Sequence, residues 1–282
     1  MKYSQRPKYE RRNETIAVLV MILLCIPVLF IYFSFFANAF ILDSTGELPL
    51  QNFQFLYQPI QHSQYTVEPI GKAFRNTVIF TAIATTLEVT ISCMAGYALA
   101  RMEFTGKRVI SFSLLTLRLF PGVLLLIGVL YVLLHLGILN TLTGVIVVAI
   151  ALRLPGSTFI IRNFFAGIPQ DIENSALVDG CNRLTAFFQV IIHMVKPGLA
   201  SISIFAFMSA WSNYLLFNVL IFNTKTPVLA TYLRVLSRND QMIADYGVFA
   251  AMAMVYMLPV LIFFFISQRQ LMQGTISGGK GI

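Results

Sequence analysis

The segment Thr15–Phe36 reads TIAVLVMILLCIPVLFIYFSFF, a run of 22 residues without a charged side chain. A helix needs about 20 predominantly apolar residues to cross the hydrocarbon core of a membrane. The apolar region of a signal peptide is shorter, about 7–15 residues. The small-x-small pattern Ala37-Asn38-Ala39 nevertheless resembles a cleavage site. We expect a retained transmembrane helix here rather than a cleaved leader.

The composition of the whole chain supports a membrane protein. Of its 282 residues, 57% are hydrophobic and 11% are charged, whereas soluble domains have about 45–50% and about 25%. We predict an all-α polytopic membrane protein with six transmembrane helices, flanked by an N-terminal segment (1–14) and a C-terminal tail (268–282). The other five runs that are long and apolar enough to span are Ala73–Ala100, Val109–Leu134, Leu142–Ile161, Gly198–Phe222 and Ala244–Ile266.

The distribution of basic residues predicts how the chain is oriented. It carries 20 Lys and Arg against 12 Asp and Glu, a formal charge of +8. With the N-terminus in the cytoplasm, 13 of the 20 cations fall in cytoplasmic segments, five fall outside, and Arg118 and Arg153 lie within spans. Cytoplasmic loops of membrane proteins are enriched in Lys and Arg. We therefore expect both termini in the cytoplasm and do not interpret the positive charge as a nucleic-acid footprint.

Several classes of chemistry lack a signature in this sequence. The cysteines, Cys25, Cys93 and Cys181, are scattered and odd in number, which supports neither a disulfide framework nor a zinc site. The three histidines are equally dispersed, and no G-x-x-x-x-G-K-[ST] phosphate loop is present. We expect no metal site, no catalytic residues and no ATP site on this chain.

The cytoplasmic segment Arg162–Pro197 is far longer than a connection between two spans requires. Pro169 suits the first turn of a helix, Gly180 suits the left-handed position at its end, and Asn182 can cap the next helix. We expect two short helices around a glycine turn, which either lie on the inner leaflet or dock onto a soluble partner. The second helix has an apolar stripe at helical spacing, formed by Leu184, Phe187, Phe188, Ile191 and Ile192.

The stretch Ile168–Gly180, IPQDIENSALVDG, resembles the "EAA" loop of bacterial ABC importer permeases, whose core pattern is E-A-A-x-x-D-G. Asn174 stands where that pattern has its Glu, and Ser175 where it has its first Ala. Glu173 matches an additional acidic residue of sugar permeases, and His193 replaces a later Pro. The residues that match the core pattern directly are Ala176, Asp179 and Gly180.

The resemblance runs from about the second span to the C-terminus. Further segments that resemble carbohydrate permeases are Phe120-Pro121, Trp211 with Tyr214-Leu215, and Asp245-Tyr246. The tail through Gly278-Gly279-Lys280-Gly281 is similar to that of the smaller permease of maltose-type importers. The resemblance implies a non-catalytic permease subunit of an ATP-driven importer for a sugar or oligosaccharide, which forms half of the pathway in the bacterial cytoplasmic (inner) membrane.

The resemblance also implies partners and a coupling site. The partners are a second permease, two ATPase subunits that hold ATP and Mg²⁺, and an extracytoplasmic binding protein, with no cofactor on this chain. Gly278 and Gly279 are expected to contact the ATPase subunits, although a frayed chain end is the alternative. The residues expected to couple to the ATPase are Glu173, Asn174, Ala176, Leu177, Asp179 and Gly180.

Three charged residues lie deep within spans, where ionisable groups are costly and usually face protein or water. Glu88 is expected to pair with Arg118 or Arg153 in a structural ion pair, with direct substrate contact as the alternative. Arg118 is the better pathway candidate because Pro121, one turn later, can kink its helix and free backbone carbonyls.

Aromatic residues are the remaining candidates for sugar contact. Tyr131, Trp211 and Tyr214 could stack on sugar rings, but aromatic residues also gather at membrane interfaces. Three other functions stay open. An importer of a non-sugar solute would share the coupling loop, and an ion-coupled secondary transporter would need its own ion-coupling groups near the midplane. A polytopic membrane enzyme would need a clustered catalytic set.

Overall fold

The computed structural model describes residues 8–40, 49–61, 66–222, 226–237 and 246–278, and the chain divides into two compact units. The first unit comprises residues 1–69 and 235–257, and the second comprises residues 70–234 and 258–282. Apart from two strands of two residues each, the regular structure in the described ranges is helical. The predicted all-α class is therefore confirmed at this level.

The first unit contains the long N-terminal helix and the segment that follows it. Its elements are α1 (Lys8–Phe40), η1 (Pro49–Leu56), the strands β1 (Ile60–Gln61) and β2 (Thr66–Val67), and the first part of α12 (Tyr246–Gly278). The strands pair antiparallel, with Ile60 opposite Val67. The side chain of Asn52 donates to the carbonyl of Ala39 at 3.0 Å, which ties η1 to the end of α1.

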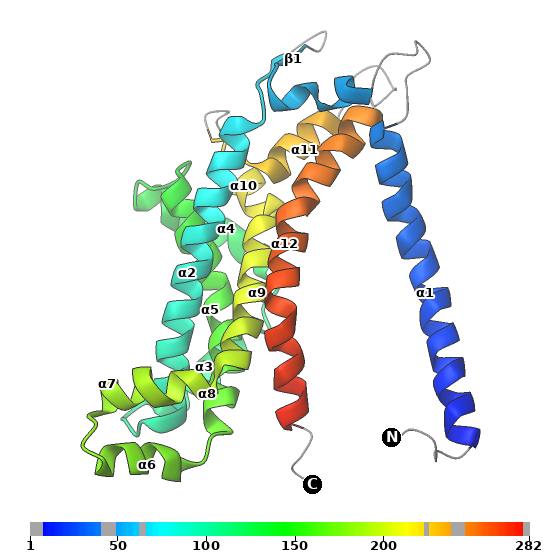
Figure 1. Ribbon diagram of the computed structural model, residues 1–282. Helices are drawn as coiled ribbons and strands as arrows, with labels where there is room; N and C mark the ends of the chain where they lie inside the picture. Colours follow the sequence, from blue (N-terminus) through cyan, green and yellow to red (C-terminus); the bar gives the residue numbers. More distant parts are fainter. Residues whose placement is uncertain (1–7, 41–48, 62–65, 223–225, 238–245, 279–282) are drawn as a thin grey trace. The chain divides into compact units, whose positions relative to one another are not determined.

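The second unit is built on three helices that pack side by side, namely α2 (Gly71–Arg101), α5 (Leu142–Ala166) and α9 (Lys196–Trp211) (Figure 1). Gly96 of α2 permits their close approach, because a Cβ there would lie 2.5 Å from Cγ2 of Ile161 on α5. The apolar core continues toward α10 (Tyr214–Leu220), where the rings of Phe80 and Phe217 meet edge-on at 4.8 Å.

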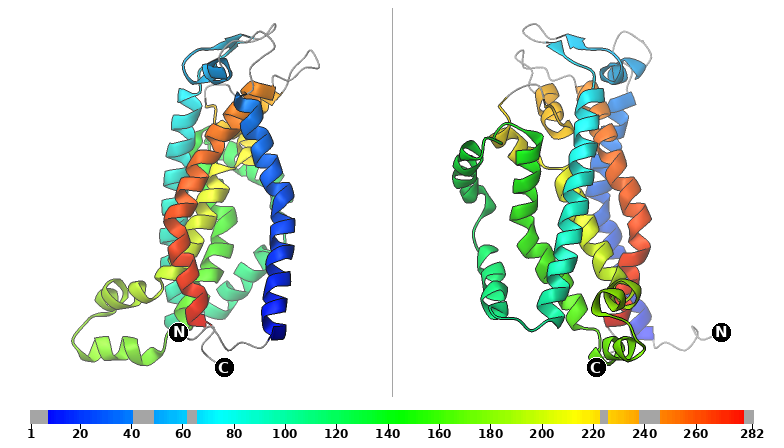
Figure 2. Two further views of the ribbon diagram at one scale, coloured as in Figure 1. Left: turned by 45° about the vertical axis from the view of Figure 1, so that its right-hand side comes forward. Right: turned by 90° about the vertical axis from the view of Figure 1, so that its left-hand side faces the viewer.

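The predicted span Val109–Leu134 does not form one continuous helix. Two helices, α3 (Lys107–Leu117) and α4 (Gly122–His135), replace it and meet at 109°. They appear as separate helices beside α5 in the right-hand view of Figure 2. The break falls at Pro121, which has no N–H to donate and disfavours helical backbone at the residue before it. The proline therefore ends the helix instead of only kinking it.

The predicted fifth span, Gly198–Phe222, is also interrupted. Helix α9 ends at Trp211, and α10 begins after Asn213, whose side chain accepts from the backbone N–H of Leu216 at 3.3 Å. At 1.5 Å per residue the 16 residues of α9 extend about 24 Å, less than the roughly 30 Å of a hydrocarbon core. The following helix is α11 (Leu229–Ser237).

Four continuous helices in the described ranges are long and apolar enough to cross a membrane, and bent helix pairs raise this number to at most six. The chain thus has the helices of a polytopic membrane protein. Helix α12 continues to Gly278, so the described part of the predicted tail is helical, whereas Gly279 and Asp245 lie outside the described residues. The four continuous segments are Thr15–Phe40, Gly71–Arg101, Leu142–Ala166 and Gly247–Gln268.

Short helices connect α5 to α9 and lie together at one end of α2, α5 and α9 (Figure 1). These are α6 (Gln170–Val178), α7 (Arg183–Ala186), the π-helical turn η2 (Phe187–Ile191) and α8 (Ile192–Met194). This segment corresponds to the long segment Arg162–Pro197 that was predicted to be cytoplasmic, and it is called the coupling loop below after its predicted role.

Candidate functional site

The coupling loop has the predicted form of two helices around a glycine turn. Helix α6 begins after Pro169, whose ψ of 136° is extended, and carries Asp171 and Glu173 in its first turn. Gly180 has φ +90°, a left-handed conformation that suits glycine. The N–H of Cys181 donates to the carbonyl of Ala176 at 3.0 Å, the long backbone bond of a Schellman-type helix end.

Asn182 caps α7 as its position in the sequence predicts. Its side-chain oxygen accepts from the backbone N–H of Thr185 at 2.7 Å. The cap satisfies one of the N–H groups that have no partner within the first helical turn. The turn between α6 and α7 is therefore set by one left-handed glycine and one capping side chain.

The predicted coupling residues divide into buried and exposed ones. Glu173 and Ala176 are each 8% exposed and face the chain itself, whereas Asn174, Asp179 and Gly180 are exposed. Leu177 is half-buried. Their role at an ATPase stays a prediction. The sequence reading did not single out Val178, which is 87% exposed, and it placed Leu184, which is 71% exposed, only on the apolar stripe.

The predicted apolar stripe of the second short helix is only partly turned inward. Phe187 and Ile191 are buried, but Leu184 and Phe188 are exposed. A π-helical turn occupies Phe187–Ile191, so the stretch departs from the regular α-helical spacing on which the stripe was predicted.

Glu173 is held by two residues at the end of α2. Its Oε1 accepts from the hydroxyl of Tyr97 at 2.6 Å, and its Oε2 lies 3.6 Å from Nε of Arg101. Nη2 of Arg101 also donates to the carbonyl of Ile168, just before α6, at 2.5 Å. We call Tyr97, Arg101 and Glu173 the α2–α6 clamp. The sequence reading missed Tyr97 and used Arg101 only as a cytoplasmic cation, although their i, i+4 spacing places both on one helix face.

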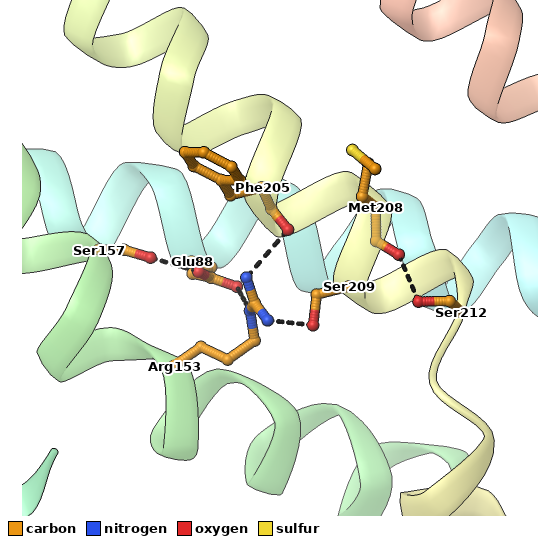
Figure 3. Close-up of polar contacts among 7 residues, drawn as sticks. All are labelled: Glu88, Arg153, Ser157, Phe205, Met208, Ser209 and Ser212. Carbon is orange, nitrogen blue, oxygen red and sulfur yellow. Dashed lines mark hydrogen bonds and ion pairs between the residues drawn. The ribbon is translucent and has the colours of Figure 1, made fainter. Parts of the chain in front are cut away.

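Glu88 forms the predicted ion pair, and Arg153 is its partner. Glu88 is 2% exposed, and its Oε2 accepts from Nε of Arg153 at 3.1 Å. Ser157 donates to the other carboxylate oxygen at 2.5 Å. Arg153 also donates to the carbonyl of Phe205 at 2.9 Å and to the hydroxyl of Ser209, both on α9 (Figure 3). This network joins α2, α5 and α9, as buried charges require partners.

Arg118 lies apart from this network. It caps the C-terminus of α3 at the break before Pro121, and it is exposed. Its guanidinium carbon lies 5.7 Å from the centre of the Phe159 ring, a cation–π contact with α5. Because it has this exposed position, Arg118 remains the pathway candidate of the two arginines.

The three aromatic candidates for sugar contact have different surroundings. Trp211 is 3% exposed, stacks on Phe207 at 5.8 Å and meets Phe74 edge-on at 6.3 Å, so its ring is part of the core. Tyr131 is 60% exposed on α4. Tyr214 is half-buried and donates to the side-chain oxygen of Asn218 at 3.0 Å. Only the two tyrosines present accessible surface in this conformation.

Comparison with known proteins gives this architecture a family. The family model described as "Binding-protein-dependent transport system inner membrane component" matches residues 88–276. The "Diacetylchitobiose uptake system permease protein NgcG" of Streptomyces coelicolor is 32% identical over 272 residues, which are 95% of this chain and 87% of that protein. The "Trehalose transport system permease protein SugB" of Mycobacterium tuberculosis is 32% identical over 209 residues, which are 74% and 76% of the two chains.

A solved structure shares the fold. It is a bacterial ABC transporter involved in the import of the acidic polysaccharide alginate, with a TM-score of 0.75 and 19% identity. The similarity covers 94% of this chain and 98% of that one.

Proposed function

Because the chain belongs to the family of inner membrane components of binding-protein-dependent transport systems, we propose that it imports a sugar or oligosaccharide. Membership establishes a membrane-embedded transport subunit in the inner membrane, and ATP hydrolysis lies on its partner subunits. In the proposed assembly this chain forms half of the pathway. A second permease forms the other half, and a binding protein delivers the substrate.

The names of the relatives support a sugar as the substrate. One relative takes up diacetylchitobiose and another transports trehalose, and the first aligns with 95% of this chain. The exposed aromatic side chain of Tyr131 is a candidate contact, because aromatic rings can pack on the apolar faces of sugars. Arg118, at the break before α4, is the charged candidate along the pathway.

We propose six crossings with both termini in the cytoplasm. The third crossing consists of α3 and α4 and the fifth of α9 and α10, each interrupted within the membrane. Broken helices at membrane depth are tolerated where the free backbone groups face protein or a water-filled cavity. The 13 cations in the segments assigned to the cytoplasm, against five outside, support this orientation.

We propose that the exposed side of the coupling loop contacts an ATPase subunit. The surface offers a polar part at Asn174 and Asp179 and an apolar part at Val178 and Leu184. Glu173 and Ala176 hold α6 to the rest of the chain from the other side. ATP and Mg²⁺ bind on the ATPase subunits, and Gly278 and Gly279 are proposed to contact these subunits.

The main observation that supports the proposal is the turn between α6 and α7 in a chain of this family. In this turn Gly180 has φ +90° and Asn182 caps α7. Copurification tests it directly. The chain solubilised in a mild detergent should retain a second permease and an ATPase, and the complex should hydrolyse ATP faster when sugar-loaded binding protein is added. Isolation of the chain alone, with no ATPase from its own operon bound under any condition, would contradict the proposal.

A further inference from the structure

The coupling loop contacts a helix to which it is not directly joined. By chain connection α6 follows α5, and α7 and α8 lead into α9. The polar side-chain contacts of α6 run instead to α2, where Tyr97 bonds Glu173 although the two residues are 76 positions apart in the chain. Motion of α6 therefore has a route into the helix bundle besides its two covalent connections.

The α2–α6 clamp consists of one hydrogen bond and one ion pair to a buried charge. Both oxygens of Glu173 have a partner in α2, and the Glu173 side chain is 11% exposed and that of Arg101 6% exposed. Hydrogen bonds to a charged group are about twice as strong as those between neutral groups. Separating α6 from α2 would leave this charge without its partners, which is costly in a buried place.

Aromatic packing fixes the ring that carries the Tyr97 hydroxyl. Its centre lies 5.6 Å from that of Phe165 at the end of α5 and 4.7 Å from that of Phe187 in η2. These are separations at which aromatic rings attract one another. The ring that carries the hydroxyl is therefore held by one ring that precedes the coupling loop and by one ring within it.

Helix α2 is also held by the contacts of Glu88, which lies nine residues before Tyr97 of the α2–α6 clamp. At 1.5 Å per residue, Glu88 lies about 14 Å along the helix from Tyr97, and its carboxylate binds Arg153, which reaches α9 (Figure 3). Between Glu88 and Tyr97, Gly96 packs directly against Ile161 of α5. One continuous helix thus connects the coupling loop with a charged network inside the membrane.

We propose that α2 receives the movement of α6 through the α2–α6 clamp and carries it to the Glu88–Arg153 network. This inference rests on the proposed function, in which an ATPase moves α6. Tyr97 and Arg101 act as positioning residues for coupling and do not touch the ATPase, nucleotide or substrate. A rigid helix fastened at two points transmits a displacement as a whole, as in rigid-body switching between packed arrangements.

The test measures sugar taken up per ATP hydrolysed by the complete importer in proteoliposomes. Tyr97→Phe keeps the ring and removes only the hydroxyl that binds Glu173. A hydrogen bond to a charged group shifts a two-state equilibrium by about tenfold or more, so we expect uptake per ATP to fall by about tenfold. Glu173→Gln, which removes the charge facing Arg101, should give a similar fall, and the double variant should be no worse than either single one. Tyr57→Phe, at a tyrosine that is 62% exposed, is the matched control.

Each outcome of this experiment decides one claim. The wild-type complex must show uptake that depends on ATP and on the binding protein, and absence of such uptake would reject the proposed function itself. If the wild-type complex shows this uptake, a Tyr97→Phe complex with the same uptake per ATP as the wild type overturns the inference. A fall of uptake and hydrolysis together, in proportion to the amount of folded complex, overturns it as well, because that pattern belongs to a merely structural contact. Additive effects in the double variant would also contradict the clamp.

Discussion

Two buried carboxylates on or against α2 illustrate what single residues contribute. Glu88 and Glu173 are 2% and 8% exposed, and each is held by an arginine and a hydroxyl. Glu103 has a very different environment, since its side chain is 88% exposed and pairs with Lys107 at 2.8 Å across the connection between α2 and α3. Exposed pairs of this kind contribute little to stability, whereas removing one partner of a buried pair is strongly destabilising.

Glu88→Ala should therefore destabilise the protein, by about 3 kcal/mol, the lower end of the range for breaking a buried pair because Arg153 is partly exposed. The measurement is the thermal unfolding of the detergent-solubilised complex together with the yield of folded protein. Glu103→Ala is the control and should unfold like the wild type. Equal stability of the two variants would show that the Glu88–Arg153 pair does not hold α2 to α5.

Gly180→Val should uncouple ATP hydrolysis from uptake while the protein still inserts into the membrane. A β-branched residue is strained at φ +90°, although nothing lies within 4 Å of a Cβ at this position. The turn between α6 and α7 should change to relieve the strain. Gly167→Val is the matched control in the same loop, because Gly167 has an ordinary φ of −76°. Normal sugar-stimulated ATPase activity and uptake in Gly180→Val would argue against a role for this turn.

At the scale of elements, capping and turn residues predicted the helices next to them. Contacts between helices far apart in the sequence could not be predicted in this way. Pro169, Gly180 and Asn182 act on their own turns, and the structure confirms the two helices that they predicted. Pro121 predicted a kink, but hydropathy continues across it and gave no indication that the backbone turns by 109°. The choice of Arg153 over Arg118 as the partner of Glu88 depends on which helix faces which, and hydropathy does not encode that.

Asn182→Ala should loosen the start of α7. Loss of an N-cap costs about 1 kcal/mol, and Asn182 is exposed, so little packing is lost with it. Amide hydrogen exchange over residues 183–186 should become faster by about fivefold, the change in opening that corresponds to this energy. Asn182→Asp retains a capping oxygen and should exchange like the wild type. Unchanged exchange in Asn182→Ala would show that the cap does not stabilise α7.

At the scale of the whole molecule, charge distribution is the main indication of orientation. The count of 13 cations against five was available from the sequence, whereas the described helices alone do not determine which ends face the cytoplasm. Cys181, half-buried beside the glycine turn, provides a reporter for the side on which the coupling loop lies.

A membrane-impermeant maleimide should label Cys181 in inside-out vesicles and not in right-side-out vesicles. Only an accessible thiolate reacts, so a variant that keeps Cys181 and carries Cys25→Ser and Cys93→Ala removes the other two thiols. Further replacement of Cys181 by serine should abolish the signal. Labelling of Cys181 from the outer side would reverse the proposed orientation of every loop.

The most direct test of the account is sugar uptake by proteoliposomes that contain this chain, its partner permease and the ATPase subunits, with the binding protein supplied. The account predicts uptake of a labelled oligosaccharide that requires ATP, the binding protein and this chain together. Uptake by this chain alone, driven by an ion gradient and unaffected by ATP, would contradict it.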